Sequence, residues 1–326
     1  MRVHRAYACG AALGHLGDLL LGDPHRGHPV AAFGRAAAAA ERALWRDSRG
    51  AGAAHTALCV AGAAVTAAAL SRAVRNTGGA TADVAFRAAV TWTVLGGSGL
   101  GSAARSVGAA LDAGDVEGAR RLLPQLCGRD PEALDADGIA RAVVESVAEN
   151  TSDAVVGALV WGAVAGVPGM AAFRALNTLD AMVGHRSPRY RHFGWAAARL
   201  DDLAGWPGAR LTAVLAALAG PYPRGAVRAW RSDAHRHPSP NAGPVEASFA
   251  GALGVRLGGT LSYGGRTEHR PVLNSAGRAV RTGDIASAVR VSRRVGVLAL
   301  VLTTAAGVGG RLAVACARAR RGSCSR

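Results

Sequence analysis

Carboxylates, amides and arginines crowd both ends of the stretch from Gly138 to Asp202, and an almost uncharged run lies between them. Carboxylates pressed against an apolar segment need a cation, a partner charge or a ligand. An ordinary soluble core has no need of this layout, so we expect a functional site here. Its acids are Glu145, Glu149, Asp153, Asp180, Asp201 and Asp202.

Glu145, Glu149 and Asp153 recur at intervals of four residues, which places them on one face of a helix. Like charges stacked in this way repel each other. A magnesium ion, or arginines from elsewhere in the chain, would relieve the repulsion. The alternative is a solvated acidic face, which fits poorly because this helix is rich in Ala and Val.

Basic and amide side chains follow the apolar run. Arg174, Asn177, Thr178 and Asp180 leave it within two turns, either as part of a site or as a capped helix end. Next come Arg186, Arg189, Arg191 and Arg199. Arginine forks bind phosphate or carboxylate through two hydrogen bonds. For each single arginine the alternative is a side chain that reaches the lipid headgroups.

The composition favours a membrane protein. Half of the 326 residues are hydrophobic, the mean hydropathy is +0.16, and several apolar runs approach the roughly 20 residues that cross a bilayer. The net charge of +16 comes from Arg alone, and the arginines are scattered between apolar runs. We therefore expect lipid headgroups, and no nucleic acid, as the anionic partner. Five cysteines without a Cys-x-x-Cys spacing argue against a disulfide framework or a zinc site.

The predicted fold class is all-α: a polytopic membrane bundle with broken or re-entrant helices and a polar cytoplasmic insert at about 221–294. No strand pattern is long enough to indicate a sheet. The Gly166–Gly169 segment breaks the run from Ala154 to Phe173, which we expect to form a re-entrant or buried helical pair. The other expected spans are Ala6–Leu21, Ala51–Leu70, Ala88–Ala104 and Val295–Cys316.

Two loops of the insert carry further candidates. His235 and His237 offer weak evidence for a metal, and a locally hydrogen-bonded pair is the more ordinary interpretation. The glycines at 258, 259, 264 and 265 either let the backbone approach a ligand or make turns.

Several short motifs, taken in order, resemble the cobinamide-phosphate synthase family of cobalamin biosynthesis. Each motif is weak by itself, but the match runs in order over nearly the whole chain. The sequence departs from the family pattern at Ala154, Ala181 and Pro244-Val245. The motifs are Gly22-Asp23-Pro24 with His28-Pro29-Val30, the segments 145–153, 177–184 and 194–202, Ser239-Pro240-Asn241-Ala242-Gly243, and Tyr263-Gly264-Gly265.

The resemblance implies an integral membrane amide synthase that occupies residues 1–326 as a single domain. Such enzymes join adenosylcobyric acid to (R)-1-aminopropan-2-ol or its O-phosphate and give adenosylcobinamide or its phosphate. ATP as cosubstrate and Mg²⁺ are expected, in a multi-pass protein of the cell membrane whose active face is cytoplasmic. Other membrane enzymes of the pathway are further candidate partners.

The residue types suit this reaction. Carboxylates hold the metal that carries phosphates, arginines bind phosphate and substrate carboxylates, and an acid or a histidine accepts the amine proton. We predict as catalytic Glu149, Asp153, Asp180, Asp201 and His28. We predict as substrate-binding Asn150, Asn177, Arg186, Arg189, Arg199, Ser239, Asn241 and Tyr263, and as metal ligands Glu145, Asp153 and Asp202.

Two other classes of function compete with the synthase. A corrinoid or ion transporter would also have broken helices and buried acids. A membrane scaffold without catalysis is the third class. The concentration of polar motifs in loops and the lack of an internal repeat count against the transporter.

Overall fold

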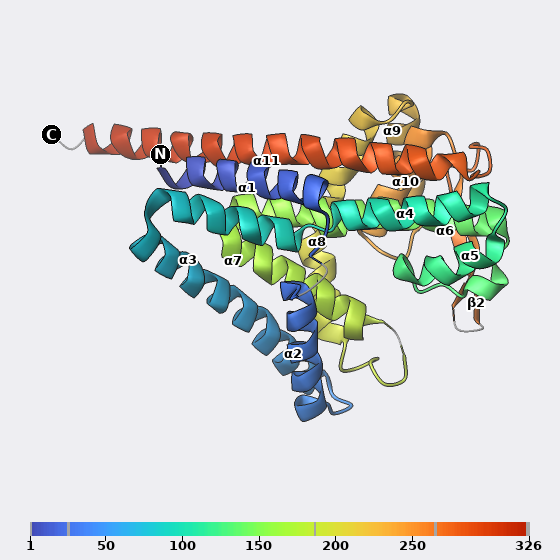
Figure 1. The fold of residues 1–326 in the computed structure, drawn as a ribbon, viewed down its shortest axis with the longest axis horizontal. Coiled ribbons are helices and arrows are strands. Elements are labelled where there is room, and N and C mark those ends of the chain that lie inside the picture. The colour runs from blue at the N-terminus through green and yellow to red at the C-terminus, as the bar shows by residue number, and fades with distance from the viewer. Residues whose placement is uncertain (1, 25–26, 186, 264–265, 324–326) are drawn as a thin grey trace. The chain divides into compact units, whose positions relative to one another are not determined.

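Helices make up most of the computed structural model (Figure 1). Two strands, β1 (Leu257–Tyr263) and β2 (Arg266–Leu273), accompany them. The helices are α1 (Arg2–Leu21), α2 (Pro29–Leu44), α3 (Arg49–Val94), α4 (Gly97–Asp112), α5 (Val116–Leu122), α6 (Ala136–Thr151), α7 (Gly157–Leu179), α8 (Trp195–Ala219), α9 (Pro223–Asp233), α10 (Ala242–Leu253) and α11 (Gly283–Ser323). The all-α prediction is confirmed.

The structure describes residues 2–24, 27–185, 187–263 and 266–323, and for residues 2–5, 261–263, 266–267 and 307–323 it describes the backbone alone. The chain divides into two compact units. Unit 1 comprises Met1–Leu95, Ala158–Arg199 and Ala299–Arg326, and unit 2 comprises Gly96–Gly157 and Leu200–Leu298. Each unit combines segments that are distant in the sequence. That the whole chain acts as a single synthase domain stays a prediction.

Within unit 1, α1 runs alongside the second half of α3 (Figure 1). Small residues on α1 allow this close approach. A Cβ atom on Gly10 would lie 2.5 Å from the Arg87 Cβ atom, and one on Gly14 would lie 2.5 Å from the Ala88 carbonyl oxygen. The Tyr7 hydroxyl donates a hydrogen bond to the Leu159 carbonyl oxygen (3.0 Å) and so joins α1 to α7.

Glycines interrupt both of the long apolar helices of unit 1. In α3 the break is at Gly79 (φ 69°, ψ −163°), and in α7 it is at Gly166 (φ 70°, ψ −157°). Glycine adopts these positive φ angles at little cost, whereas a residue with a Cβ atom would be strained there. The predicted break at Gly166–Gly169 is therefore confirmed, whereas a re-entrant course of α7 stays a prediction.

Two helical runs, Arg49–Asp112 and Ala136–Gly184, are long and apolar enough to cross a membrane, and Ala6–Leu21 is a shorter apolar helix. The expected span over Ala88–Ala104 is interrupted, because α3 ends at Val94 and α4 begins at Gly97. Residues 71–83, between the expected spans Ala51–Leu70 and Ala88–Ala104, are helical and belong to α3 apart from its break. The sequence therefore indicated the apolar segments but misplaced their ends.

A hydrophobic cluster in unit 1 holds the loop that follows α7. Phe193 is fully buried among Ala37, Cys59, Leu179 and Val183. The backbone passes so closely here that a Cβ atom on Gly52 would lie 1.8 Å from the Phe193 carbonyl oxygen, and one on Gly194 would lie 1.7 Å from that of Val183. Because these glycines have no side chain, the segment that carries the predicted arginines can pack closely within unit 1.

Unit 2 is built from α4, α5, α6, α9, α10, the strands and parts of α8 and α11. The Thr151 hydroxyl donates to the Ser292 hydroxyl (2.7 Å) and so links α6 to α11. Helices α9 and α10 cross closely, since a Cβ atom on Gly251 would lie 2.2 Å from the Gly225 carbonyl oxygen. Every residue of α10 is buried, so the centre of the expected polar insert is a core helix.

The strands β1 and β2 form an antiparallel hairpin with an irregular register between Leu257 and Gly259. The prediction that no strand pattern supports a sheet was wrong. Gly258 (φ 82°) and Gly259 (φ 89°) have backbone angles that favour glycine and break the alternation by which a strand is recognised. The hairpin docks on α6, where Arg141 donates to the Thr260 carbonyl oxygen (3.0 Å).

Candidate functional site

The three acids of α6 and the turn that follows have different surroundings. Glu145 is buried, Glu149 is exposed and Asp153 is half-buried. The Glu145 carboxylate forms a buried ion pair with Arg129, and its second oxygen accepts a hydrogen bond from the Gly258 backbone N–H (2.6 Å). An arginine from elsewhere, one of the two predicted sources of relief, therefore neutralises Glu145. Its role as a metal ligand stays a prediction.

A π turn at Ser152–Val156 contains Asp153, and a second π turn at Asp180–Gly184 begins with Asp180. Such turns insert an extra residue into a helix and are frequent at functional sites. The first turn departs from the regular α-helix that the four-residue spacing of Glu145, Glu149 and Asp153 assumes. Asn150 lies beside this turn and donates from its side-chain amide to the Ser146 carbonyl oxygen (2.9 Å).

In unit 2, Asn241 joins two of the sequence motifs. Its side-chain nitrogen donates to the Asp202 carbonyl oxygen (2.8 Å), and its side-chain oxygen accepts from Arg210 (3.0 Å). A Cβ atom on Gly205 would lie 2.6 Å from the Asn241 side-chain nitrogen, so the absence of a side chain at this glycine leaves room for Asn241. The backbone of Asp202 is thereby held next to the start of α10, and Asp201 and Asp202 are both half-buried.

Ser239 and His237 shape the turn that leads into α10. The Ser239 hydroxyl accepts from the backbone N–H groups of Asn241 (3.3 Å) and Ala242 (3.1 Å). His237 Nδ1 accepts from the Ser239 N–H (3.1 Å), whereas His235 is exposed. The local hydrogen-bonded interpretation of this histidine pair is therefore confirmed for His237.

His237 also faces a buried carboxyl group that the sequence analysis did not select. Its Nε2 atom lies 3.7 Å from Glu246 Oε1, and the two side chains are 3% and 4% exposed. Burial, and then the charges of Glu145 and Glu149, raises the pKa of Glu246 well above its ordinary value of 4.5. Burial, and then the charge of Arg270, lowers the pKa of His237. Both shifts favour the neutral forms of the pair.

Two of the predicted residues of unit 1 lie at the end of α7. Asn177 and Asp180 are half-buried, and the Thr178 hydroxyl donates back to the Arg174 carbonyl oxygen (2.7 Å), which is an i−4 contact within the helix. The Asp180 carboxylate lies over the backbone of Gly184, where a Cβ atom would be 1.9 Å from Asp180 Oδ1. Glycine at this position therefore makes the place of the carboxylate possible.

The predicted arginines of unit 1 differ in their contacts. Arg189 pairs with the buried Glu41 (3.0 Å) and stacks over the Trp45 ring (4.5 Å). The Tyr190 hydroxyl donates to the same Glu41 oxygen (2.9 Å). Arg199 is exposed, and the prediction for Arg186 lies outside the described residues. Arg189 thus has a structural partner beside any substrate it binds.

His28 caps α2, because its Nδ1 atom accepts the Val30 backbone N–H (3.2 Å). A neutral imidazole in this arrangement carries its proton on Nε2. It would have to break the cap or change tautomer to accept a proton from an amine. The predicted role of His28 as a base stays a prediction, and the cap is a second use for the residue.

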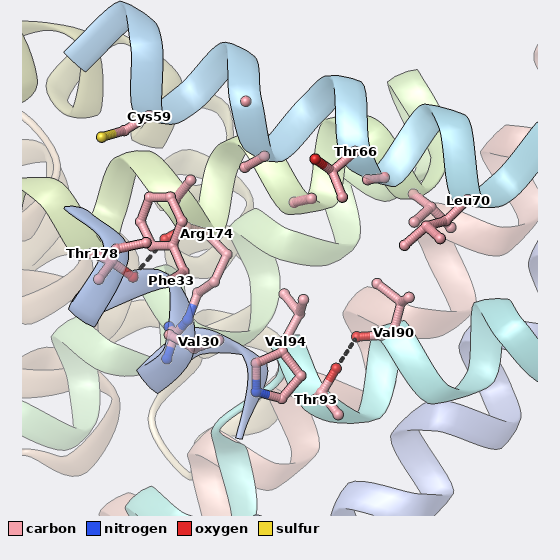
Figure 2. Close-up of a pocket in the computed structure, with 18 of the residues that line it drawn as sticks. Val30, Phe33, Cys59, Thr66, Leu70, Val90, Thr93, Val94, Arg174 and Thr178 are labelled. Atoms are coloured by element: carbon pink, nitrogen blue, oxygen red, sulfur yellow. Dashed lines mark hydrogen bonds between the residues drawn. The ribbon is translucent and has the colours of Figure 1, made fainter. Parts of the chain in front are cut away.

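An apolar groove of about 690 Å³ in unit 1 is lined by α2, α3 and α7 (Figure 2). Pro29 and Val30, from the motif that begins at His28, line it together with Arg174 and Thr178. The groove thus brings two separated motifs of unit 1 to one surface. Within the described part of the chain, no group of three His, Cys, Asp or Glu side chains is arranged to hold a metal ion.

The predicted residues therefore form two groups. Glu145, Glu149, Asn150, Asp153, Asp201, Asp202, Ser239 and Asn241 belong to unit 2, and His28, Asn177, Asp180, Arg189 and Arg199 belong to unit 1. The side chain of Tyr263 lies outside the described residues. Sequence reasoning missed Arg129, Glu246 and Glu41, whose burial is a property of the folded chain alone.

Comparison with known proteins places the chain among described relatives. The family model described as "CobD/Cbib protein" matches residues 11–292. A Mycobacterium tuberculosis (strain ATCC 25618 / H37Rv) protein named "Cobalamin biosynthesis protein CobD" is 54% identical over 299 residues, which are 90% of this chain and 94% of the relative. Proteins of the same name from Sinorhizobium fredii (strain NBRC 101917 / NGR234) and Chromobacterium violaceum are 40% and 43% identical, over 85% of this chain and 90% and 89% of theirs. No solved structure matches.

Proposed function

The chain belongs to the CobD/Cbib family, and on that premise we propose that it acts in cobalamin biosynthesis as a membrane-bound amide synthase. The match confirms the family resemblance of the sequence motifs. The proposed reaction joins a carboxylate of adenosylcobyric acid to (R)-1-aminopropan-2-ol or its O-phosphate, with ATP as cosubstrate. The observation that carries the proposal is the family match over residues 11–292.

A carboxylate accepts an amine only after one of its oxygens becomes part of a leaving group. In the proposed first step, a carboxylate oxygen of the corrinoid attacks the γ-phosphorus of ATP, which gives an acyl phosphate and ADP. The amine nitrogen then attacks the carbonyl carbon, the C–O bond to phosphate breaks, and the ammonium proton passes to a base. Binding both substrates in one orientation supplies much of the rate.

The acids next to Asn241 support this chemistry. Mg²⁺ is usually held by one or two carboxylates together with substrate phosphates, so a complete protein cage is not required. Asp202 and Asp153 are the residues proposed to hold it, where it would neutralise phosphate charge. Asn241 fixes the backbone of Asp202 through its 2.8 Å hydrogen bond.

Exposed charged residues suit the two remaining roles, which are binding of phosphate or carboxylate groups and acceptance of the amine proton. Arg199 and Arg189 are exposed and offer forks for phosphate or carboxylate. Glu149 is an exposed acid one helical turn from Asp153 and is proposed as the proton acceptor, with His28 as the alternative.

We place the protein in the cell membrane as a multi-pass enzyme whose active face is cytoplasmic. Two helical runs long enough to cross a membrane support this location. The reaction needs residues on both sides of α7 in one compartment. Accessibility labelling of single cysteines at positions 150 and 180 tests this, because labelling from opposite faces would contradict the proposal.

The decisive experiment uses purified protein with adenosylcobyric acid, aminopropanol phosphate, ATP and Mg²⁺, with the amide product measured by mass spectrometry. Asp153→Asn and Asp202→Asn are expected to lower the rate by at least about 100-fold, as the loss of charge stabilisation predicts. The matched control is Asp137→Asn, an exposed acid in the first turn of α6. Full activity in both test variants would rule out the proposed roles.

A corrinoid or ion transporter remains the second candidate, because helix breaks at Gly79 and Gly166 are typical of transporters as well. The two candidates differ in their need for a sealed compartment. Conversion of adenosylcobyric acid by detergent-solubilised protein supports the synthase. Corrinoid uptake into vesicles without conversion would support the transporter.

A further inference from the structure

The groove between α2, α3 and α7 has an amphiphilic lining. Small and apolar side chains such as Ala63, Ala67 and Val90 make up most of its wall. Of its described lining residues, Arg174 is the charged one. A volume of about 690 Å³ is in the range of sites that hold small molecules.

The charged group lies toward one end of the groove. In Figure 2, Arg174 and Thr178 lie toward one side, and Leu70 and Val90 lie toward the other. Cys59 and Leu70, which both line the groove on α3, are separated by about 16 Å at 1.5 Å per helical residue. The groove is therefore elongated, with a cationic end and an apolar end. An anion with a long hydrocarbon chain has the complementary shape and charge.

The outer side of α3 indicates where such a molecule would come from. The most apolar window of the run Arg49–Asp112 is only 6% buried inside the protein. Val65, which does not line the groove, is 67% exposed, and the lining residues Leu58 and Leu70 are 59% and 50% exposed. Exposed apolar surface of this kind requires a cover, and in a membrane protein the cover is lipid.

We propose that the groove binds a phospholipid of the surrounding bilayer, with one acyl chain between α2, α3 and α7 and the anionic headgroup at Arg174. The apolar wall selects the chain, and the guanidinium selects a negatively charged headgroup over a zwitterionic one. Pro29, Val30 and Thr178 place the bound lipid beside two motifs of unit 1. The inference rests on the proposed membrane location and does not depend on the proposed reaction.

Gly62 provides a precise way to close the groove. It lines the groove, and a Cβ atom built on it meets no heavy atom within 4 Å. The position therefore has room for a Cβ atom, and Gly62→Phe adds bulk at the groove wall. Thr66→Phe, at another exposed lining position, is the second filling variant. Ala61→Phe is the matched control, since Ala61 is an exposed α3 residue that does not line the groove.

The probe is phosphatidylglycerol with a photoreactive group on one acyl chain, or phosphatidylcholine with the same chain, in vesicles that contain the full-length protein. After illumination, labelled peptides are quantified by mass spectrometry. We expect wild-type label on the lining segments of α2, α3 and α7, a decrease of at least about fivefold in both filling variants, and no change in Ala61→Phe. Unchanged labelling in both folded filling variants would overturn the proposal.

The headgroup is tested by Arg174→Gln, with Arg72→Gln, an exposed α3 residue outside the groove, as the control. One arginine near an anionic surface predicts about a fivefold preference for phosphatidylglycerol, which the first variant loses and the second keeps. Equal labelling by both lipids in the wild type would overturn the anionic assignment. Thermal unfolding in detergent shows that each variant is folded.

Discussion

Glu145 accepts a hydrogen bond from the backbone N–H of Gly258 at 2.6 Å, and this contact joins a helix to a strand far away in the sequence. Its second oxygen pairs with Arg129, and both side chains of that pair are almost fully buried. One carboxylate therefore fixes three segments of unit 2: α6, the loop before it and the hairpin. The residue that the sequence marks as a metal ligand has a structural role as well.

The first prediction concerns the stability of this contact. Glu145→Ala leaves Arg129 buried without its partner, so we expect the free energy of unfolding to fall by about 3–5 kcal/mol. The measurement is unfolding of the purified protein in detergent. Glu117→Ala removes an exposed ion pair with Arg120 and is expected to cost less than about 1 kcal/mol. Similar losses in the two variants would show that the Glu145 pair is not specially stabilising.

The second prediction concerns the positioning of Asp202. Asn241→Ala removes both the hydrogen bond to the Asp202 carbonyl oxygen and the one from Arg210. A displacement of about 1 Å in a reacting group costs up to about 100-fold in rate, so we expect kcat to fall by about 10–100-fold with little change in KM. The control is Ser232→Ala, an exposed residue on α9. A normal kcat in Asn241→Ala would contradict the positioning role.

The third prediction uses the contact between Asp180 and Gly184. Because a Cβ atom at position 184 would lie 1.9 Å from Asp180 Oδ1, Gly184→Ala must displace the carboxylate. We expect synthase activity to fall by about 100-fold. Gly50→Ala is the control, since the nearest atom to its Cβ is the Ser48 hydroxyl at 3.6 Å. If the folded Gly184→Ala protein keeps full activity, Asp180 has no catalytic role.

The fourth prediction is a pH dependence that comes from Glu246. Its pKa is raised in the folded state, so the native protein binds more protons than the unfolded chain above pH 4.5. Stability must therefore decrease as the pH rises from about 4.5 toward the raised pKa. Glu246→Gln keeps the neutral shape and removes the titration, so its melting temperature relative to wild type is expected to increase with pH.

His237 contributes with the opposite sign, because its pKa is lowered and the folded protein resists its protonation. Its contribution to stability is lost as the pH falls below the ordinary histidine value of 6.5. Melting curves between pH 5 and pH 9 separate the two groups, since their contributions change with pH in opposite directions and Glu246→Gln removes the one that decreases as the pH rises. The charged groups facing Glu246 are Glu145, Glu149, Arg129, Arg270 and His237, and all are retained. The same pH dependence in Glu246→Gln and wild type would contradict the assignment.

Local patterns in the sequence were sufficient for some features of the fold. The break in α7 was visible in Gly166-Val167-Pro168-Gly169, because glycine and proline disturb a helix through their own backbone chemistry. The apolar runs were visible for the same reason, as hydropathy is a property of consecutive residues. The hairpin was missed because Gly258 and Gly259 removed the alternation expected of a strand.

The sequence by itself determined the family, the helical class and the residue types available for the chemistry, because these depend on order and composition. Tertiary structure alone decided which charges meet. Arg129 became the partner of Glu145, and Glu246 the neighbour of His237, because folding brought distant segments together and removed water from between them. Burial and pairing are set by the surrounding atoms, and no spacing along the chain records them.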